Sequence, residues 1–315
     1  MKTKRLDKKD VVEAAEIIKS GGIVAFPTET VYGLGADVFN EGAVKKIFEV
    51  KGRPADNPLI VHIADKEDVE KIAFVNENAK KLIDKFWPGP LTIILKKKDI
   101  PDIVTAGLDS VAIRMPRNET ALELIRKSGM IAAPSANLSG KPSATNFKHV
   151  LDDFDGKVDA IIKDEDSEIG LESSVIDLTG KPKLLRPGGL SLEDVEKVIG
   201  KLEVSDGNEE IIKSPGMKHK HYSPNAILVL VEGDNHEIVR EEIDRMADEY
   251  SVEGKKVEIM YNEELQKFAK SLFKRMRELD KEKVDVIIVE GVKEAGIGLA
   301  VMNRLRKAAS RTIKV

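Results

Sequence analysis

The chain has 315 residues, of which 41% are hydrophobic, 4% aromatic and 34% charged, and its formal net charge at pH 7 is −4. This length is enough for two domains of ordinary size, and the slightly acidic balance excludes a global basic field that would hold nucleic acid. No cysteine occurs, which excludes disulfides, cysteine-bound zinc and a thiol nucleophile and fits a reducing, cytoplasmic location.

The N-terminal residues 1–5 read MKTKR and lack the apolar stretch of a signal peptide. No run of about 18 apolar residues occurs, so we expect no transmembrane helix. The first predicted element is a helix over residues 7–19, with apolar side chains on one face and Gly21 as its stop signal.

The first motif spans residues 21–35 and reads GGIVAFPTETVYGLG. Its apolar run 23–26 predicts a buried strand, which ends at Pro27 because proline cannot donate to a sheet ladder. Gly33 and Gly35 are expected to let the backbone turn sharply or approach a ligand closely. A strand that feeds a polar loop is typical of ligand sites in open α/β sheets. An ordinary turn with solvated hydroxyls explains the pattern equally well.

A helix predicted over residues 41–50 leads into the loop KGRP, which carries Lys51 and Arg53. Cations are favoured at the C-terminus of any helix, so a solvated helix end is the simpler interpretation. The strand predicted over residues 59–63 follows almost at once, and it pins both cations between two elements. This favours a rigid basic loop. His62 lies in that strand, where a histidine is more often a satisfied core residue than a ligand.

Polar groups also follow the later predicted strands. Arg114 ends an apolar run, and a buried arginine needs a counter-charge from the chain or from a ligand carboxylate or phosphate. The strand 131–133 opens onto residues 134–143, PSANLSGKPS, a loop rich in hydroxyl and amide groups. Such loops also form simple turns. Another strand ends in Arg186, directly before a proline and two glycines.

The pattern changes after about residue 203. Residues 201–213 are mostly polar and charged, which is typical of a linker. His219 and His221 follow beside two lysines, but no acidic or cysteine partner lies near them, so metal binding is not favoured. A solvated linker end and an anion-facing flap remain equal alternatives. From residue 226 strands and helices alternate regularly, which predicts a small parallel α/β domain.

Several separate motifs, in the same order along the chain, resemble those of the YrdC-type threonylcarbamoyl-AMP synthases in their longer, two-domain form. The motifs are PTETVYGL at 27–34, Lys51-x-Arg53, WPGPLT at 87–92, RMP at 114–116, Ser135-x-Asn137, LRPG at 185–188 and PGMxxxHY at 215–222. The resemblance implies an open, twisted, mixed α/β sheet over residues 1–203, a linker over 204–225 that folds over the active site, and a small α/β Rossmann-like domain over 226–315.

The resemblance also implies a reaction, that of an ATP-dependent nucleotidyltransferase. L-Threonine, bicarbonate or CO2, and ATP give threonylcarbamoyl-AMP and pyrophosphate, with Mg2+ accompanying ATP. Other proteins then transfer the threonylcarbamoyl group to tRNA. No membrane and no stable nucleic-acid partner are implied. The chemistry requires positioning and neutralisation of phosphate charge more than a protein nucleophile.

The resemblance assigns the candidate site residues to two groups. Those expected to bind ATP are Lys51, Arg53, Asn57, Ser110, Ser135, Asn137, Ser143, Arg186 and Tyr222, with Lys51 and Arg53 also expected to be catalytic. Those expected to bind L-threonine are Thr30, His62, Arg114, Ala133 and Ser173. Arg114 is expected to hold the carboxylate of threonine as a bidentate fork, and Tyr222 to cover the nucleotide and exclude water. No protein-held metal site is expected.

Two alternatives belong to other functional classes. An RNA-binding module would use the concave face of the sheet, but the net acidity and the few aromatic residues weaken this interpretation. Carbamoyl-transfer enzymes of hydrogenase maturation contain a similar domain. They carry cysteine-rich zinc fingers, whereas this chain has no cysteine.

Overall fold

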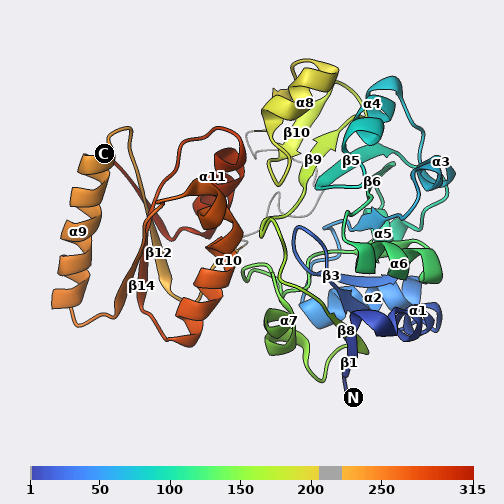
Figure 1. Ribbon diagram of the computed structural model, residues 1–315, viewed down its shortest axis with the longest axis horizontal. Coiled ribbons are helices and arrows are strands. Elements are labelled where there is room, and N and C mark those ends of the chain that lie inside the picture. The colour runs from blue at the N-terminus through green and yellow to red at the C-terminus, as the bar shows by residue number, and fades with distance from the viewer. Residues whose placement is uncertain (1, 206–221) are drawn as a thin grey trace. The chain divides into compact units, whose positions relative to one another are not determined.

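A computed structural model describes residues 2–205 and 222–315 (Figure 1). The described residues form two compact units, which we treat separately. The first contains residues 2–139 and 143–205, and the second contains residues 140–142 and 222–315. Within these ranges no helix is both long and apolar enough to cross a membrane.

The first unit is built on a mixed sheet which, among the described residues, has 11 strands in the order β1-β8-β2-β3-β7-β4-β6-β5-β9-β10-β11. Its central strands are β7 (Ile131–Ala133), β4 (Ile60–His62), β6 (Ser110–Arg114), β5 (Leu91–Lys96) and β9 (Ser174–Asp177). The flanking strands are β1 (Lys4–Asp7), β8 (Ala160–Lys163), β2 (Val24–Phe26), β3 (Gly33–Asp37), β10 (Lys183–Arg186) and β11 (Glu203–Val204). Parallel and antiparallel pairs alternate irregularly across it. The predicted mixed sheet is confirmed.

The helices of the first unit begin at side-chain caps that the sequence indicates. Asn40, Asn118 and Ser191 each accept a hydrogen bond from a backbone N–H of the first turn of a helix. The helices are α1 (Val11–Lys19), α2 (Glu41–Lys51), α3 (Val69–Ile72), α4 (Glu77–Phe86), α5 (Asp102–Thr105), α6 (Glu119–Ser128), α7 (Phe147–Phe154) and α8 (Leu192–Ile199), with short 3-10 turns at Lys8–Asp10 and Lys66–Asp68. The cap at Asn40 explains why the predicted helix 41–50 lies close to the observed α2.

The expectation that Gly33 and Gly35 form a sharp turn is wrong, and their close approach to a ligand stays a prediction. Both lie in β3, which pairs antiparallel with β2. A Cβ atom on Gly33 would lie 2.9 Å from the Phe26 ring, and one on Gly35 would lie 2.5 Å from Cγ2 of Ile131. The two glycines therefore leave the space that the buried ring of Phe26, on the neighbouring strand, occupies.

The second unit contains a parallel sheet in the order β13-β14-β12-β15. Its elements are β12 (Ile227–Glu232), α9 (His236–Val252), β13 (Val257–Met260), α10 (Leu265–Lys281), β14 (Val286–Glu290), α11 (Ile297–Ala308) and β15 (Arg311–Lys314). Figure 1 shows α9 on one face of this sheet and α10 and α11 on the other. The predicted small parallel α/β domain is confirmed.

The predicted linker over 204–225 falls mainly on residues 206–221, which lie outside the described residues, as do His219 and His221. Its placement over the site and the limits of 1–203 and 226–315 stay predictions.

Candidate active site

Three polar side chains stand in register across the centre of the first sheet. His62 on β4 pairs with Arg114 on β6, and Arg114 pairs with Thr92 on β5. Residues that are paired across neighbouring strands project on the same face of a sheet. All three are buried, with 4% or less of each residue exposed. The strand register thus builds a polar row inside an otherwise aliphatic sheet.

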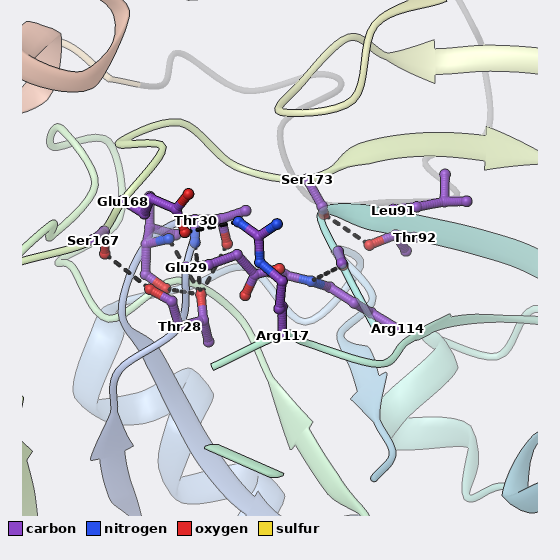
Figure 2. A network of polar contacts seen from close by, with 12 residues as sticks. Thr28, Glu29, Thr30, Leu91, Thr92, Arg114, Arg117, Ser167, Glu168 and Ser173 are labelled. Carbon is purple, nitrogen blue, oxygen red and sulfur yellow. Dashed lines mark hydrogen bonds and ion pairs between the residues drawn. The ribbon is translucent and has the colours of Figure 1, made fainter. Parts of the chain in front are cut away.

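The charge of Arg114 is matched by Glu29, which lies in the loop after β2. Its Nη2 is 2.8 Å from Oε1 of Glu29, and its Nε donates a long hydrogen bond, 3.4 Å, to the carbonyl of Gly89. Figure 2 shows Glu29 beside the two threonines that flank it in sequence, facing the Arg114 side chain. The counter-charge that the sequence required for Arg114 therefore comes from within the chain.

His62 is uncharged at neutral pH. Burial, helped by the neighbouring Arg114 charge, lowers the pKa of His62 from 6.5 to about 3. Its Nδ1 lies 3.1 Å from the carbonyl oxygen of Ile60, and its ring packs edge-on against Phe26, with the ring centroids 5.8 Å apart. In this row the positive charge thus resides on Arg114. His62 contributes a neutral ring with nitrogen atoms that can form hydrogen bonds.

Ser173 joins the row to the arginine at the end of β10. Its hydroxyl lies 2.7 Å from that of Thr92, and Figure 2 shows the two facing each other. Arg186 donates to the Ser173 carbonyl through Nε at 3.2 Å and Nη2 at 3.0 Å. Ser173, predicted to bind threonine, and Arg186, predicted to bind ATP, are therefore direct neighbours.

The loop after β2 is held by its own hydroxyls. The hydroxyls of Thr28 and Thr30 lie 2.9 Å apart, and that of Thr28 donates to the Val31 carbonyl at 2.6 Å. Thr30 is fully buried, so it is not a solvated turn residue. Ala133 ends β7, where it pairs with Ile60 of β4. The predicted threonine-binding residues thus come from strands and loops of a single sheet.

Lys51 lies at the C-terminal end of α2 and supports the loop that follows β7. It is buried, and its Nζ donates to the carbonyl oxygens of Ser135, at 2.5 Å, and of Asn137. The Ser135 hydroxyl donates to Oδ1 of Asn137 at 2.6 Å. The ammonium therefore fixes the conformation of this loop, and three residues predicted to bind ATP are brought together.

Arg53 folds back on its own loop and donates to the carbonyls of Asn57, at 3.2 Å, and Pro58, at 3.0 Å. The buried Oδ1 of Asn57 accepts no hydrogen bond from a described residue. The Ser143 hydroxyl donates to Oε1 of Glu172 at 2.5 Å.

The two remaining predicted ATP-binding residues are Ser110 and Tyr222. Ser110 begins β6, at the end of the strand opposite to Arg114. Tyr222 belongs to the second unit, where its ring stacks on Phe273 at a centroid distance of 5.3 Å and lies 5.3 Å from the Arg304 guanidinium. The roles of both in binding ATP stay predictions.

Sequence reasoning missed Glu29, Thr92 and Glu172. For Thr92 the signal was present, because it is a lone polar residue in the apolar run 91–95. For the two glutamates the sequence offered only carboxylates within polar loops, which are usually solvated. Among residues 2–205 and 222–315, no group of three or more histidine, aspartate or glutamate side chains is placed to hold a metal ion.

Comparison with known proteins covers almost the entire chain. A Sua5/YciO/YrdC family model, described as "Telomere recombination", matches residues 16–188. A second model, described as "Threonylcarbamoyl-AMP synthase, C-terminal domain", matches residues 190–310. These two matches define the class as two-domain proteins in which a YrdC-type domain precedes a Sua5 C-terminal domain.

Named relatives agree with this class. A threonylcarbamoyl-AMP synthase of Pyrococcus abyssi is 50% identical over 99% of this chain and 97% of its own length. One of Bacillus subtilis is 47% identical, over 95% and 92%. A crystal structure of P. abyssi Sua5 complexed with L-threonine superposes with a TM-score of 0.96 and 48% identity, covering 100% of both chains. The chain belongs to the threonylcarbamoyl-AMP synthase family, which confirms the resemblance seen in its motifs.

Proposed function

We propose that this chain is an L-threonylcarbamoyladenylate synthase, a nucleotidyltransferase that makes threonylcarbamoyl-AMP and pyrophosphate from ATP, L-threonine and bicarbonate or CO2. The observation that carries the proposal is the buried row of His62, Arg114 and Thr92. It lies in a chain that aligns over its full length with a relative solved in complex with L-threonine. The RNA-binding alternative gains no support from these relatives.

The amino-acid side of the site suits a small polar zwitterion. Arg114 supplies a fixed guanidinium for the carboxylate, because its β-strand position and its contact with Glu29 limit its freedom. Neutral His62 and the hydroxyls of Thr30 and Ser173 supply hydrogen bonds without further charge. We assign Thr30, His62, Arg114, Ala133 and Ser173 to threonine on these grounds.

The nucleotide side is proposed to lie at the loop that Lys51 supports. Cations and hydroxyl groups suit a triphosphate, and Asn57 has a buried oxygen that accepts no hydrogen bond from the described residues. The ATP-binding set is Lys51, Arg53, Asn57, Ser110, Ser135, Asn137, Ser143, Arg186 and Tyr222. We propose that Mg2+ enters bound to the phosphate oxygens of ATP.

The reaction follows from this arrangement. The amine of threonine captures CO2 and loses a proton, giving a carbamate. A carbamate oxygen then attacks the α-phosphorus of ATP, the bond to the β-phosphate oxygen breaks, and pyrophosphate leaves. Positioning and charge neutralisation supply most of the catalysis. The product is proposed to pass to threonylcarbamoyl-transferring proteins that act on tRNA in the cytoplasm.

The proposal is tested by pyrophosphate release, with threonine, bicarbonate or ATP omitted in turn and the adenylate identified by mass spectrometry. Release should require all three substrates. It should be lost in Arg114→Ala and kept in Arg117→Ala, because Arg117 is an exposed residue that pairs with exposed Glu168. Release that needs neither threonine nor bicarbonate would contradict the assignment.

A further inference from the structure

Glu29 is a buried carboxylate whose hydrogen-bonding capacity is not used by the part of the chain that the structure describes. Only 4% of the residue is exposed, and neither Oε1 nor Oε2 accepts a hydrogen bond from any residue in the described ranges. Among the described residues its charged contact is Arg114 Nη2, 2.8 Å from Oε1, and the N–H directions there are not aligned for a hydrogen bond. The pair is therefore held by charge alone.

The desolvation cost of such a pair is not fully offset by its contacts. Taking two charges out of water costs several kcal/mol per ion unless additional hydrogen bonds satisfy the remaining oxygens and protons. Around Glu29, the hydroxyls of Thr28 and Thr30 are turned to each other and to the Val31 carbonyl. The described residues thus leave the carboxylate without a donor, in a loop directly beside the threonine-binding row (Figure 2).

An amino-acid zwitterion has the complementary pattern. Its carboxylate only accepts hydrogen bonds and matches the guanidinium, whereas its ammonium has three N–H donors and no acceptor. We propose that Glu29 binds the α-ammonium of the amino-acid substrate while Arg114 binds its carboxylate. This inference rests on the proposed function and adds to it the group that selects α-amino acids against their hydroxy-acid analogues.

A positioning role is the competing explanation, in which Glu29 only orients Arg114. The two roles differ in what they recognise. A residue that acts through Arg114 affects every ligand that carries the carboxylate. A residue that binds the ammonium affects only ligands that carry the amine. A pair of ligands that differ in this group alone therefore separates the two roles.

The test is isothermal titration calorimetry of the full chain with L-threonine and with 2,3-dihydroxybutanoate of the same configuration, in which a hydroxyl replaces the ammonium. In Glu29→Gln we expect threonine affinity to fall about 10- to 100-fold, the range for hydrogen bonds to charged groups. Affinity for the hydroxy acid should change less than about threefold, because that ligand has no ammonium for Glu29 to bind. Glu168→Gln, which removes an exposed carboxylate from the same neighbourhood, should alter neither affinity.

Two outcomes overturn the inference alone, provided that the wild type binds threonine: equal weakening of both ligands, or unchanged threonine affinity. A wild type that binds no threonine overturns the proposed function as well. If Glu29→Gln does not fold, Glu29→Asp retains the charge but withdraws it from the ligand. It should then lower threonine affinity selectively, and equal losses for both ligands would again contradict the inference.

Discussion

The amino-acid side and the nucleotide side of the proposed site differ in how their polar groups are satisfied. Beside the strand row, Glu29 has two buried oxygens that accept no hydrogen bond from the described residues. On the nucleotide side most polar groups bond to one another, as Lys51 does to two carbonyls and Ser135 does to Asn137, although the buried Oδ1 of Asn57 accepts no hydrogen bond from the described residues.

The two sides therefore differ in how much they must rearrange when the ligand binds. A row of side chains held on strands, beside a carboxylate with unused hydrogen-bonding capacity, is preorganised, so a ligand completes it without rearrangement. A loop whose groups already bond to one another must exchange some of those bonds for phosphate. The amino-acid side should therefore depend on charge pairing, and the nucleotide side on loop conformation.

The largest effect is expected from breaking the buried pair. Arg114→Met leaves Glu29 without its charge partner, which should lower the free energy of unfolding by about 3–5 kcal/mol in urea titrations. Arg117→Met is the control, because an exposed pair contributes about 0–1 kcal/mol. An Arg114→Met variant as stable as the wild type would show that the pair is not needed by the fold.

The double variant Arg114→Met/Glu29→Gln distinguishes the loss of one charge from the loss of both. It removes both charges, so it should regain at least half of the lost stability yet release no pyrophosphate. A double variant less stable than Arg114→Met would contradict the account of the pair.

Acid should destabilise the strand row through His62. Its pKa is 6.5 in the unfolded chain and about 3 in the folded one, so between these values the unfolded state binds more protons. The stability is present in full above about pH 6.5 and falls by up to about 1.4 kcal/mol per pH unit as the pH drops towards 3. Urea titrations from pH 7 to pH 4 should show a shallower decline in His62→Gln, and parallel declines would contradict this.

A larger side chain at Gly35 should destabilise the sheet of the first unit. Gly35→Ala places a Cβ 2.5 Å from Ile131 and 2.8 Å from the Phe26 ring. We expect about 1–3 kcal/mol of destabilisation from overpacking. Gly180→Ala is the matched control, because a Cβ there meets nothing within 4 Å. Equal melting temperatures for the two variants would overturn this explanation of the glycines.

The smallest effect is expected at Thr92. Thr92→Val removes the hydroxyl that contacts Ser173, worth about 0.5–1.5 kcal/mol. The KM for threonine should rise about 2- to 10-fold, while the KM for ATP stays constant. Thr105→Val is the control, since that buried hydroxyl bonds to Lys97. A change in the KM for ATP alone would assign Thr92 to the nucleotide side.

Much of the fold could be predicted from local patterns. Cap residues such as Asn40 and Ser191 mark helix starts, and apolar runs such as 91–95 mark strands. Gly33 and Gly35 were misinterpreted because the need for glycine comes from Phe26, a neighbour across the sheet that local conformation does not reveal.

The site was predicted less completely, and for a similar reason. Arg114 was recognisable as a strand-end cation that needs a partner, but its partner Glu29 lies 85 residues earlier in the chain, and only the folding of the first unit brings the two together. Lys51 was expected to face a ligand, whereas its contacts with the loop carbonyls depend on how α2 packs against β3, next to β7 in the sheet.

The central claim is that the strand row holds the amino acid and the Lys51 loop holds the nucleotide. It is tested most directly by calorimetric titration of L-threonine into Lys51→Met and Arg114→Met. The account predicts that Lys51→Met binds threonine with nearly wild-type affinity although it releases no pyrophosphate, and that Arg114→Met binds none. Loss of threonine binding in Lys51→Met, or its retention in Arg114→Met, would contradict the account.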